Sequence, residues 1–129
     1  MQNKLTYIEA NGRNYPIVFN INVMEEIQEA YGTISAWGAI VENAEGGEPK
    51  VKDLKIGLMM MINEGIDIEN ELTGGNMQMV TTKQVGRMTL KKLLKLYKHY
   101  KNHYDFTLSG RTYRELEEIA DHEGEFLPD

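Results

Sequence analysis

The first hydrophobic segments of the chain have the composition of β-strands. Residues 5–10 and 15–19 are rich in β-branched and aromatic side chains, and Asn11-Gly12 lies between them. An Asn-Gly pair between two such segments is the strongest short-range signal of a two-residue hairpin turn. Pro16 has no backbone N–H, which suits the start or the edge of a strand. The sequence therefore predicts an N-terminal β-hairpin.

After residue 20 the apolar positions recur at three- and four-residue spacing, which places them on one face of a helix. These positions are Val23, Ile27, Ala30, Tyr31 and Ile34. The opposite face carries Glu25 and Glu29. Asn20 or Asn22 can cap the first turn, and Gly32 provides a left-handed stop. This pattern predicts an amphipathic helix whose apolar stripe faces the core.

Two further helices are expected before residue 73. Apolar residues between 34 and 44 indicate a short second helix. Pro49 suits the first position of a third helix, because its missing N–H has no partner there. We expect this helix to span Pro49 to Glu64 and to end at Gly65. Asp67 could then cap one more turn, from Ile68 to Leu72.

The third helix is apolar on nearly every side. Its main face carries Val51, Leu54, Leu58, Met61 and Ile62, and the apolar surface extends through Ile56, Met59 and Met60. A helix of this kind is either central in a core or covered by a partner. Methionine in a helix serves packing more often than docking, so the core is the favoured interpretation.

The second half of the chain is read as a loop, a long helix, a last helix and a tail. Leu72 to Val80 has the composition of a mobile loop. Thr81 and Gln84 have the spacing of a capping box, which opens a helical stretch to about His103 with a bend near Met88. Its apolar stripe consists of Val85, Met88, Leu93, Leu96, Tyr97, Tyr100 and Tyr104. A last helix is expected from residue 112 to 120.

These elements together predict a mainly helical α+β fold, in which an N-terminal β-hairpin packs on about four to five helices. The chain has 129 residues, which is the size of one domain. We expect residues 1–120 to form that domain, with a sub-boundary near 88–90. Residues 121–129 are expected to form an acidic flexible tail.

Charge is unevenly distributed along the chain. The formal net charge is −6, yet residues 83–101 contain seven Lys and Arg residues and no acid, so the remainder carries −13. An acidic body with one basic segment favours self-association or a charged partner.

There is no cysteine, which excludes a disulfide framework, a thiol nucleophile and a cysteine zinc site. No apolar run approaches a membrane span, and the N-terminus lacks a signal-peptide core, so a cytoplasmic protein is expected.

Candidate catalytic and metal-binding residues are few. His99 and His103 have the i, i+4 spacing of metal ligands, but no third ligand is evident and lysines surround them. The acidic cluster formed by Glu64, Asp67, Glu69 and Glu71 lacks the pattern of a calcium loop. The Gly-Gly pairs lack the lysine and the strand–loop–helix context of a phosphate-binding loop. We therefore expect no enzyme, no cofactor and no bound metal.

Three stretches of the sequence resemble one known family. They are NGRNYPIVFNINVMEEIQEAYGTISAWGAIVE, LKIGLMMMINEGIDIENE and TTKQVGRM, which together span residues 11–88. This part is similar to the tail assembly chaperones of long-tailed phages and prophages of Gram-positive bacteria. After Met88 the chain departs from the family pattern. The resemblance implies a non-enzymatic protein of the host cytoplasm that coats the tape-measure protein and leaves as tail tube subunits arrive.

The resemblance also suggests a surface for the client. Our hypothesis is that Met59, Met60 and Met61, with Tyr31 and Trp37 nearby, form or support an adaptable groove for apolar helices.

The exposed charges suggest contacts between copies of the chain. Lys91 and Lys95 could pair with the acidic Glu25/Glu29 face of another copy, which would give a homo-oligomer. Two alternatives remain. One is a phage connector subunit that forms a ring, and the other is a small nucleic-acid-binding regulator that uses the basic helix 83–101.

Overall fold

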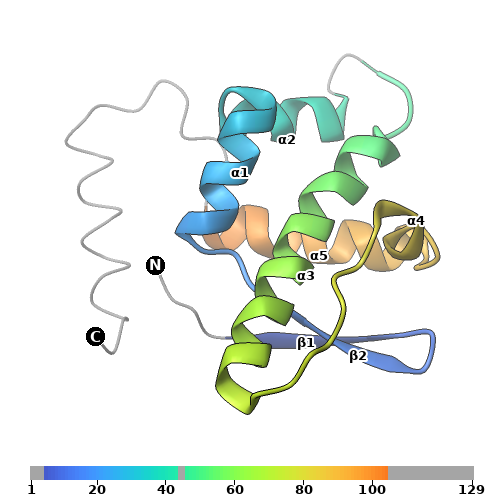
Figure 1. Cartoon of the computed structure of the whole chain (residues 1–129). Coiled ribbons are helices and arrows are strands. Elements are labelled where there is room, and N and C mark those ends of the chain that lie inside the picture. The colour runs from blue at the N-terminus through green and yellow to red at the C-terminus, as the bar shows by residue number, and fades with distance from the viewer. Residues whose placement is uncertain (1–4, 44–45, 105–129) are drawn as a thin grey trace.

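The computed structural model describes residues 5–43 and 46–104, which form a β-hairpin and five helices (Figure 1). In chain order they are β1 Thr6–Ala10, β2 Arg13–Ile17, α1 Ile21–Tyr31, α2 Ile34–Glu42, α3 Val51–Thr73, α4 Thr82–Val85 and α5 Leu90–Tyr104. The predicted mainly helical α+β fold with an N-terminal hairpin is therefore confirmed. The predicted helix at 112–120 and the acidic tail at 121–129 lie outside the described residues.

The hairpin closes through the predicted Asn-Gly turn. Asn11 and Gly12 have φ angles of 55° and 77°, which is the left-handed pair that a two-residue type I′ turn requires. The strands are antiparallel, and Ala10 lies opposite Arg13 directly before and after the turn. The alternation of the strands directs one face toward the helices. The buried residues on that face are Ile8, Ala10, Tyr15 and Ile17.

Helix α3 crosses the hairpin at Gly65, where backbone meets backbone. A methyl group on Gly65 would lie 2.7 Å from the carbonyl carbon and oxygen of Pro16 and 2.8 Å from the nitrogen of Ile17. One turn earlier in α3, the Met61 carbonyl accepts a hydrogen bond from the Val18 N–H at 3.3 Å. Pro16 fits this edge of β2, because the edge faces the helix and needs no N–H there.

The prediction that Gly65 ends the third helix was therefore wrong. Helix α3 continues for two further turns, through Asp67, and ends at Gly74, whose φ of 72° gives the left-handed stop. The helix also begins at Val51 rather than at Pro49, with Lys50 as its cap residue. A glycine within a helix indicates close packing as readily as it indicates a stop.

The other predicted helix ends are mostly confirmed. The Asn20 side chain caps α1 by accepting a hydrogen bond from the Val23 N–H, and Gly32 follows the helix with a φ of 89°. Thr81 and Gln84 form the predicted capping box. The long helix expected after it is interrupted, because α4 ends at Val85 and α5 starts only at Leu90.

Trp37 lies where α2, α3 and α5 meet. Its side chain is 0% exposed, and its indole N–H donates to the Asp53 carbonyl at 2.8 Å. A methyl group on Gly57 would lie 2.1 Å from the indole ring, so α3 approaches α2 closely through this glycine. The Tyr97 ring of α5 meets the indole edge-on at 5.4 Å between ring centroids. One aromatic residue thus fixes the relative positions of three helices.

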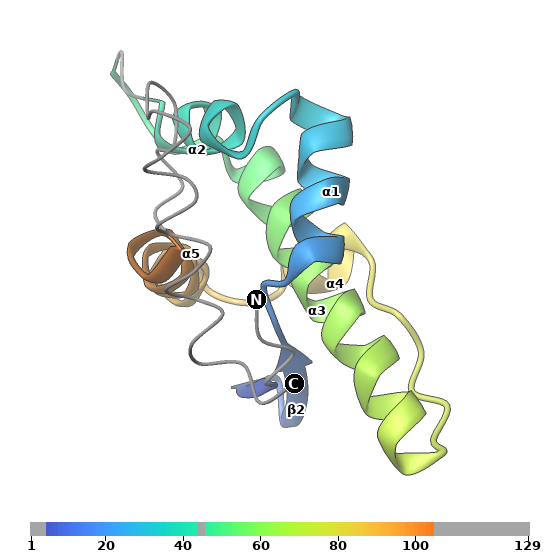
Figure 2. The same cartoon turned by 90° about the vertical axis from the view of Figure 1, so that its left-hand side faces the viewer.

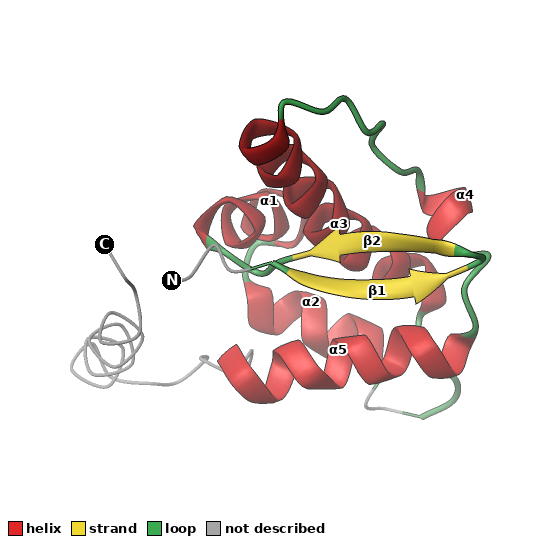
Figure 3. Ribbon diagram, turned by 90° about the horizontal axis from the view of Figure 1, so that it is seen from below, coloured by secondary structure: helices red, strands yellow, loops and turns green. Residues whose placement is uncertain are grey.

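The same side of α5 is also joined to α2 by a polar contact near the protein surface. The Glu42 carboxylate accepts hydrogen bonds from the Tyr97 hydroxyl at 2.6 Å and from Lys101 Nζ at 2.5 Å. Burial and this carboxylate both raise the pKa of Tyr97. Helix α5 runs alongside the hairpin on the β1 side, whereas α3 lies on the β2 side (Figures 2 and 3).

We predict that Gly65→Ala destabilises the protein by about 1–3 kcal/mol, because the added methyl group meets backbone atoms that cannot rotate away. Urea unfolding followed by circular dichroism measures this loss. Gly75→Ala is the matched control, since Gly75 is exposed and a methyl group there meets only side-chain atoms. Equal unfolding midpoints for the two variants would contradict the close contact.

We also predict that the Glu42 contact stabilises the fold at neutral pH and not in acid. Burial would raise the pKa of Glu42, but the hydrogen bonds from Lys101 and Tyr97 outweigh it and lower that pKa. A pKa below the unfolded value of about 4.3 adds stability above that pH, and the stability is lost as the pH falls through the folded-state pKa.

The Glu42→Gln variant measures this contribution. The Glu42 side chain is 40% exposed, so we expect the variant to lose less than about 1 kcal/mol at neutral pH. Well below the folded-state pKa both proteins carry a neutral side chain, so their urea midpoints should converge. Glu48→Gln, at an exposed residue, is the control. A midpoint difference that does not change with pH would refute the proposed linkage.

Candidate partner-binding groove between β1 and α5

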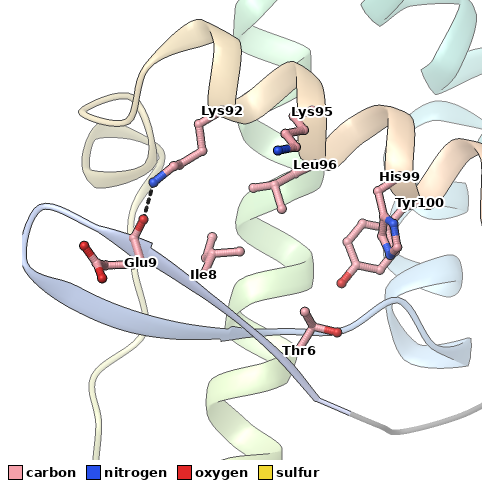
Figure 4. A pocket seen from close by; sticks show the side chains of 8 residues that line it. All are labelled: Thr6, Ile8, Glu9, Lys92, Lys95, Leu96, His99 and Tyr100. Carbon is pink, nitrogen blue, oxygen red and sulfur yellow. Dashed lines mark hydrogen bonds between the residues drawn. The ribbon is translucent and has the colours of Figure 1, made fainter.

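A groove of about 310 Å³ lies between β1 and α5 (Figure 4). Its lining residues are Thr6, Ile8, Glu9, Lys92, Lys95, Leu96, His99 and Tyr100. The helical members recur every three or four residues and so share one face of α5, while Thr6 and Ile8 share one face of β1. The groove therefore separates one helix face from one strand face.

The groove has an apolar floor and a basic rim. Ile8 and Tyr100 are buried and Leu96 is half-buried, so these side chains give the floor its apolar character. Lys92 and Lys95 extend from α5 on the same side. Burial raises the pKa of the Tyr100 hydroxyl, and a hydrogen bond with Thr6 offsets part of that effect. An apolar side chain flanked by negative charge would complement this surface.

The outer edge of β1 faces the groove. Residues opposite each other in an antiparallel pair alternate between hydrogen-bonded and non-bonded, and the pair that flanks a two-residue turn is bonded. Ala10 and Arg13 flank the turn and form a hydrogen-bonded pair, so Ile8 and Tyr15 form the next bonded pair. The backbone N–H and C=O groups of Tyr7 and Glu9 therefore point away from β2. The Glu9 carbonyl accordingly accepts a hydrogen bond from Lys92 Nζ. The opposite edge of the hairpin packs against α3.

Two residues predicted to form or support the client groove belong to the core instead. Trp37 and Met61 are both 0% exposed, so neither reaches the surface of the described chain. Trp37 has its own partners in α3 and α5, as described above.

The neighbouring methionines Met59 and Met60 are half-buried and lie on opposite flanks of α3. Successive helix residues differ by about 100° in direction, so these two side chains point to different sides of the helix. Met60 shares a row with Glu64, which accepts hydrogen bonds from α1. Met59 shares a row with Asn63, whose side chain binds the segment that follows α3.

The remaining predicted site residues have three different placements. Lys95 lines the groove, whereas Lys91 is exposed on α5 outside it. Tyr31 is half-buried, and its hydroxyl donates to Asp53 at 2.7 Å. Burial and this carboxylate together raise the pKa of Tyr31.

The strand side of the groove was not predicted from the sequence. Ile8 and Leu96 were assigned to a strand and to a helix stripe, but nothing in the local pattern indicated that the two would face each other. They are 88 positions apart, and periodicity reports only local structure. The basic rim was the available signal, since Lys92 and Lys95 lie on the face that also presents Leu96.

The described residues also bear on three other possibilities: a nucleic-acid surface, a metal site and a membrane span. Tyr97 and Tyr100 are 2% and 5% exposed, so neither is available to stack on a nucleic-acid base. Within residues 5–43 and 46–102, no three histidine or acidic side chains converge to hold a metal ion, and the His103 side chain lies outside that part. In the same part of the chain, no helix is long and apolar enough to cross a membrane.

Three consecutive residues of α3 hold the scaffold together. Asn63 binds both backbone groups of Val80, at 3.0 and 2.7 Å. Glu64 accepts hydrogen bonds from Asn20 at 2.7 Å and from Asn22 at 2.8 Å. With Gly65 against the hairpin, three consecutive residues of α3 thus bind three different parts of the fold.

Known proteins were compared with the chain in three ways. No model of a protein family matches it, and no curated protein and no solved structure matches it. Interpretation of the groove therefore depends on its own geometry and on the sequence stretches described above.

Proposed function

We propose that this protein is a non-enzymatic phage tail assembly chaperone, which binds the tape-measure protein in the cytoplasm of the bacterial host. The observation that carries the proposal is the role of Asn63, Glu64 and Gly65. These residues belong to one of the stretches that resemble the chaperone family, and each forms a contact that determines the fold. The resemblance thus involves the residues that shape the domain, which supports a shared fold and a shared class of function.

The groove suits the weak and reversible binding that such a chaperone requires. A volume of about 310 Å³ is at the lower limit of ligand pockets. It has space for one or two apolar side chains, but not for a whole helix of about 10 Å diameter. A small anchor repeated by many copies along one long client gives avidity, while each copy remains displaceable by tail tube subunits.

Charge supports association between copies. Glu25 and Glu29 are exposed on α1, and Lys91 and Lys95 are exposed on α5. Complementary faces on one chain favour a homo-oligomer in which α1 of one copy meets α5 of the next.

The test of the function is co-expression with the tape-measure protein from the same genome, followed by affinity purification and light scattering. We expect the tape-measure protein to become soluble and to co-purify with many copies of this chain. Lys95→Glu should reduce the recovered client, because it reverses a charge on the groove rim. Lys83→Glu, an exposed change away from the groove, should not.

The alternatives predict different results in the same experiment. An insoluble client together with a discrete ring of this chain would indicate a connector subunit. Salt-dependent DNA binding without client binding would indicate a regulator that uses the α5 lysines. Circular dichroism of both variants must first show that they fold, so that lost binding is not lost structure.

We further predict that self-association weakens strongly with salt. Raising the ionic strength from about 0.1 M to about 1 M shortens the screening length from about 10 Å to about 3 Å. Light scattering should then report a shift toward smaller species. An oligomer whose size is the same in both solutions would be held by apolar contacts rather than by α1–α5 charge pairs.

A further inference from the structure

We propose that the acidic segment 121–129 of this chain docks in the groove between β1 and α5. The segment has the sequence DHEGEFLPD and lies outside the described residues. This inference goes beyond the proposed function, because the segment would compete with client side chains for the same groove. Its test follows this chain alone, so it can fail while the proposed function stands. Four properties of the groove and of the sequence support it: charge, apolar fit, backbone geometry and reach.

Charge complementarity is the first property. Segment 121–129 contains four acidic residues and no Lys or Arg. Lys92 and Lys95 line the groove together with one acidic residue, Glu9, and residues 90–104 of α5 include no acid. The acidic segment 121–129 would therefore meet a face of α5 that carries lysines and no acidic residue.

The apolar content of the segment matches the size of the groove. Phe126 and Leu127 are its only large apolar residues. The floor formed by Ile8, Leu96 and Tyr100 offers about 310 Å³, which suits one or two such side chains. An isolated apolar pair between acidic residues would thus fill a small apolar groove between lysines.

Backbone geometry favours an extended occupant. The polar backbone groups of Tyr7 and Glu9 point away from β2, toward the groove side of the hairpin. The Glu9 carbonyl already accepts a hydrogen bond from Lys92, so the Tyr7 groups and the Glu9 N–H are the ones that would bond to an added strand. A peptide that lies along such an edge adds a strand and gains main-chain hydrogen bonds. Pro128 is compatible with that position, because an added strand has an outer edge of its own.

The chain is long enough for this return. Helix α5 ends at Tyr104, about one turn after the groove residue Tyr100. The whole helix is about 22 Å long at about 1.5 Å per residue. Residues 105–120 could span roughly 50 Å when extended, at about 3.3 Å per residue. Even a partly folded connection can therefore bring residue 126 to the groove.

Paramagnetic broadening in the full-length protein tests the docking. The chain has no cysteine, so Pro128→Cys provides a single site for a nitroxide label. We expect selective loss of the amide signals of β1 and of the groove face of α5. Lys92→Glu/Lys95→Glu should restore these signals. Lys91→Glu/Lys98→Glu should not, because it makes the same charge change on α5 outside the groove.

A second variant separates docking from the stability of the domain. Phe126→Asp leaves the groove unchanged and should also restore the signals. Uniform broadening, or broadening unaffected by either Phe126→Asp or Lys92→Glu/Lys95→Glu, would overturn the proposal. A mixture of isotope-labelled chains that lack the nitroxide with nitroxide-labelled chains that lack the isotope distinguishes docking within one chain from docking between two copies. Broadening in that mixture at the level of the single-chain sample would assign the groove to a second copy and would also overturn it.

Discussion

The contact between Gly65 and the Pro16–Ile17 backbone determines how the whole fold is arranged. It holds the β2 edge of the hairpin directly against α3, with no side chain between the two backbones. The outer edge of β1 is consequently left on the other side, where α5 lies (Figure 3). Trp37, Tyr97 and Glu42 then hold α5 at that side through core packing and hydrogen bonds. The groove is the space that these two sets of contacts leave between β1 and α5.

Features that depend on a few adjacent residues were predictable from the sequence. The Asn11-Gly12 turn, the Asn20 cap and the Thr81 capping box each arise from side chains that act within three positions of their own backbone. The stripe of buried residues in α1 and α5 follows from periodicity, which is also local. These signals were sufficient for the fold class and for most helix starts.

Features that depend on distant partners were not predictable. In the sequence, Gly65 looks the same as a glycine that ends a helix. Only the folded structure shows that it lets the α3 backbone approach the backbone of Pro16. Consecutive methionines suggested one adaptable surface, but the helix directs Met59 and Met60 to opposite flanks and Met61 into the core. The groove joins residues of β1 to residues of α5, so neither segment alone indicates it.

The part of the chain on which the proposed function rests is separate from the groove. That part is residues 11–88, whereas every groove residue lies before residue 10 or after residue 91. That part contains the scaffold contacts of Asn63, Glu64 and Gly65. The exposed groove residues Lys95 and His99 can differ at little cost to the fold, whereas the floor residues Ile8 and Tyr100 belong to the core. Partner choice would then be set by β1 and α5, because these supply the charges and apolar side chains that line the groove.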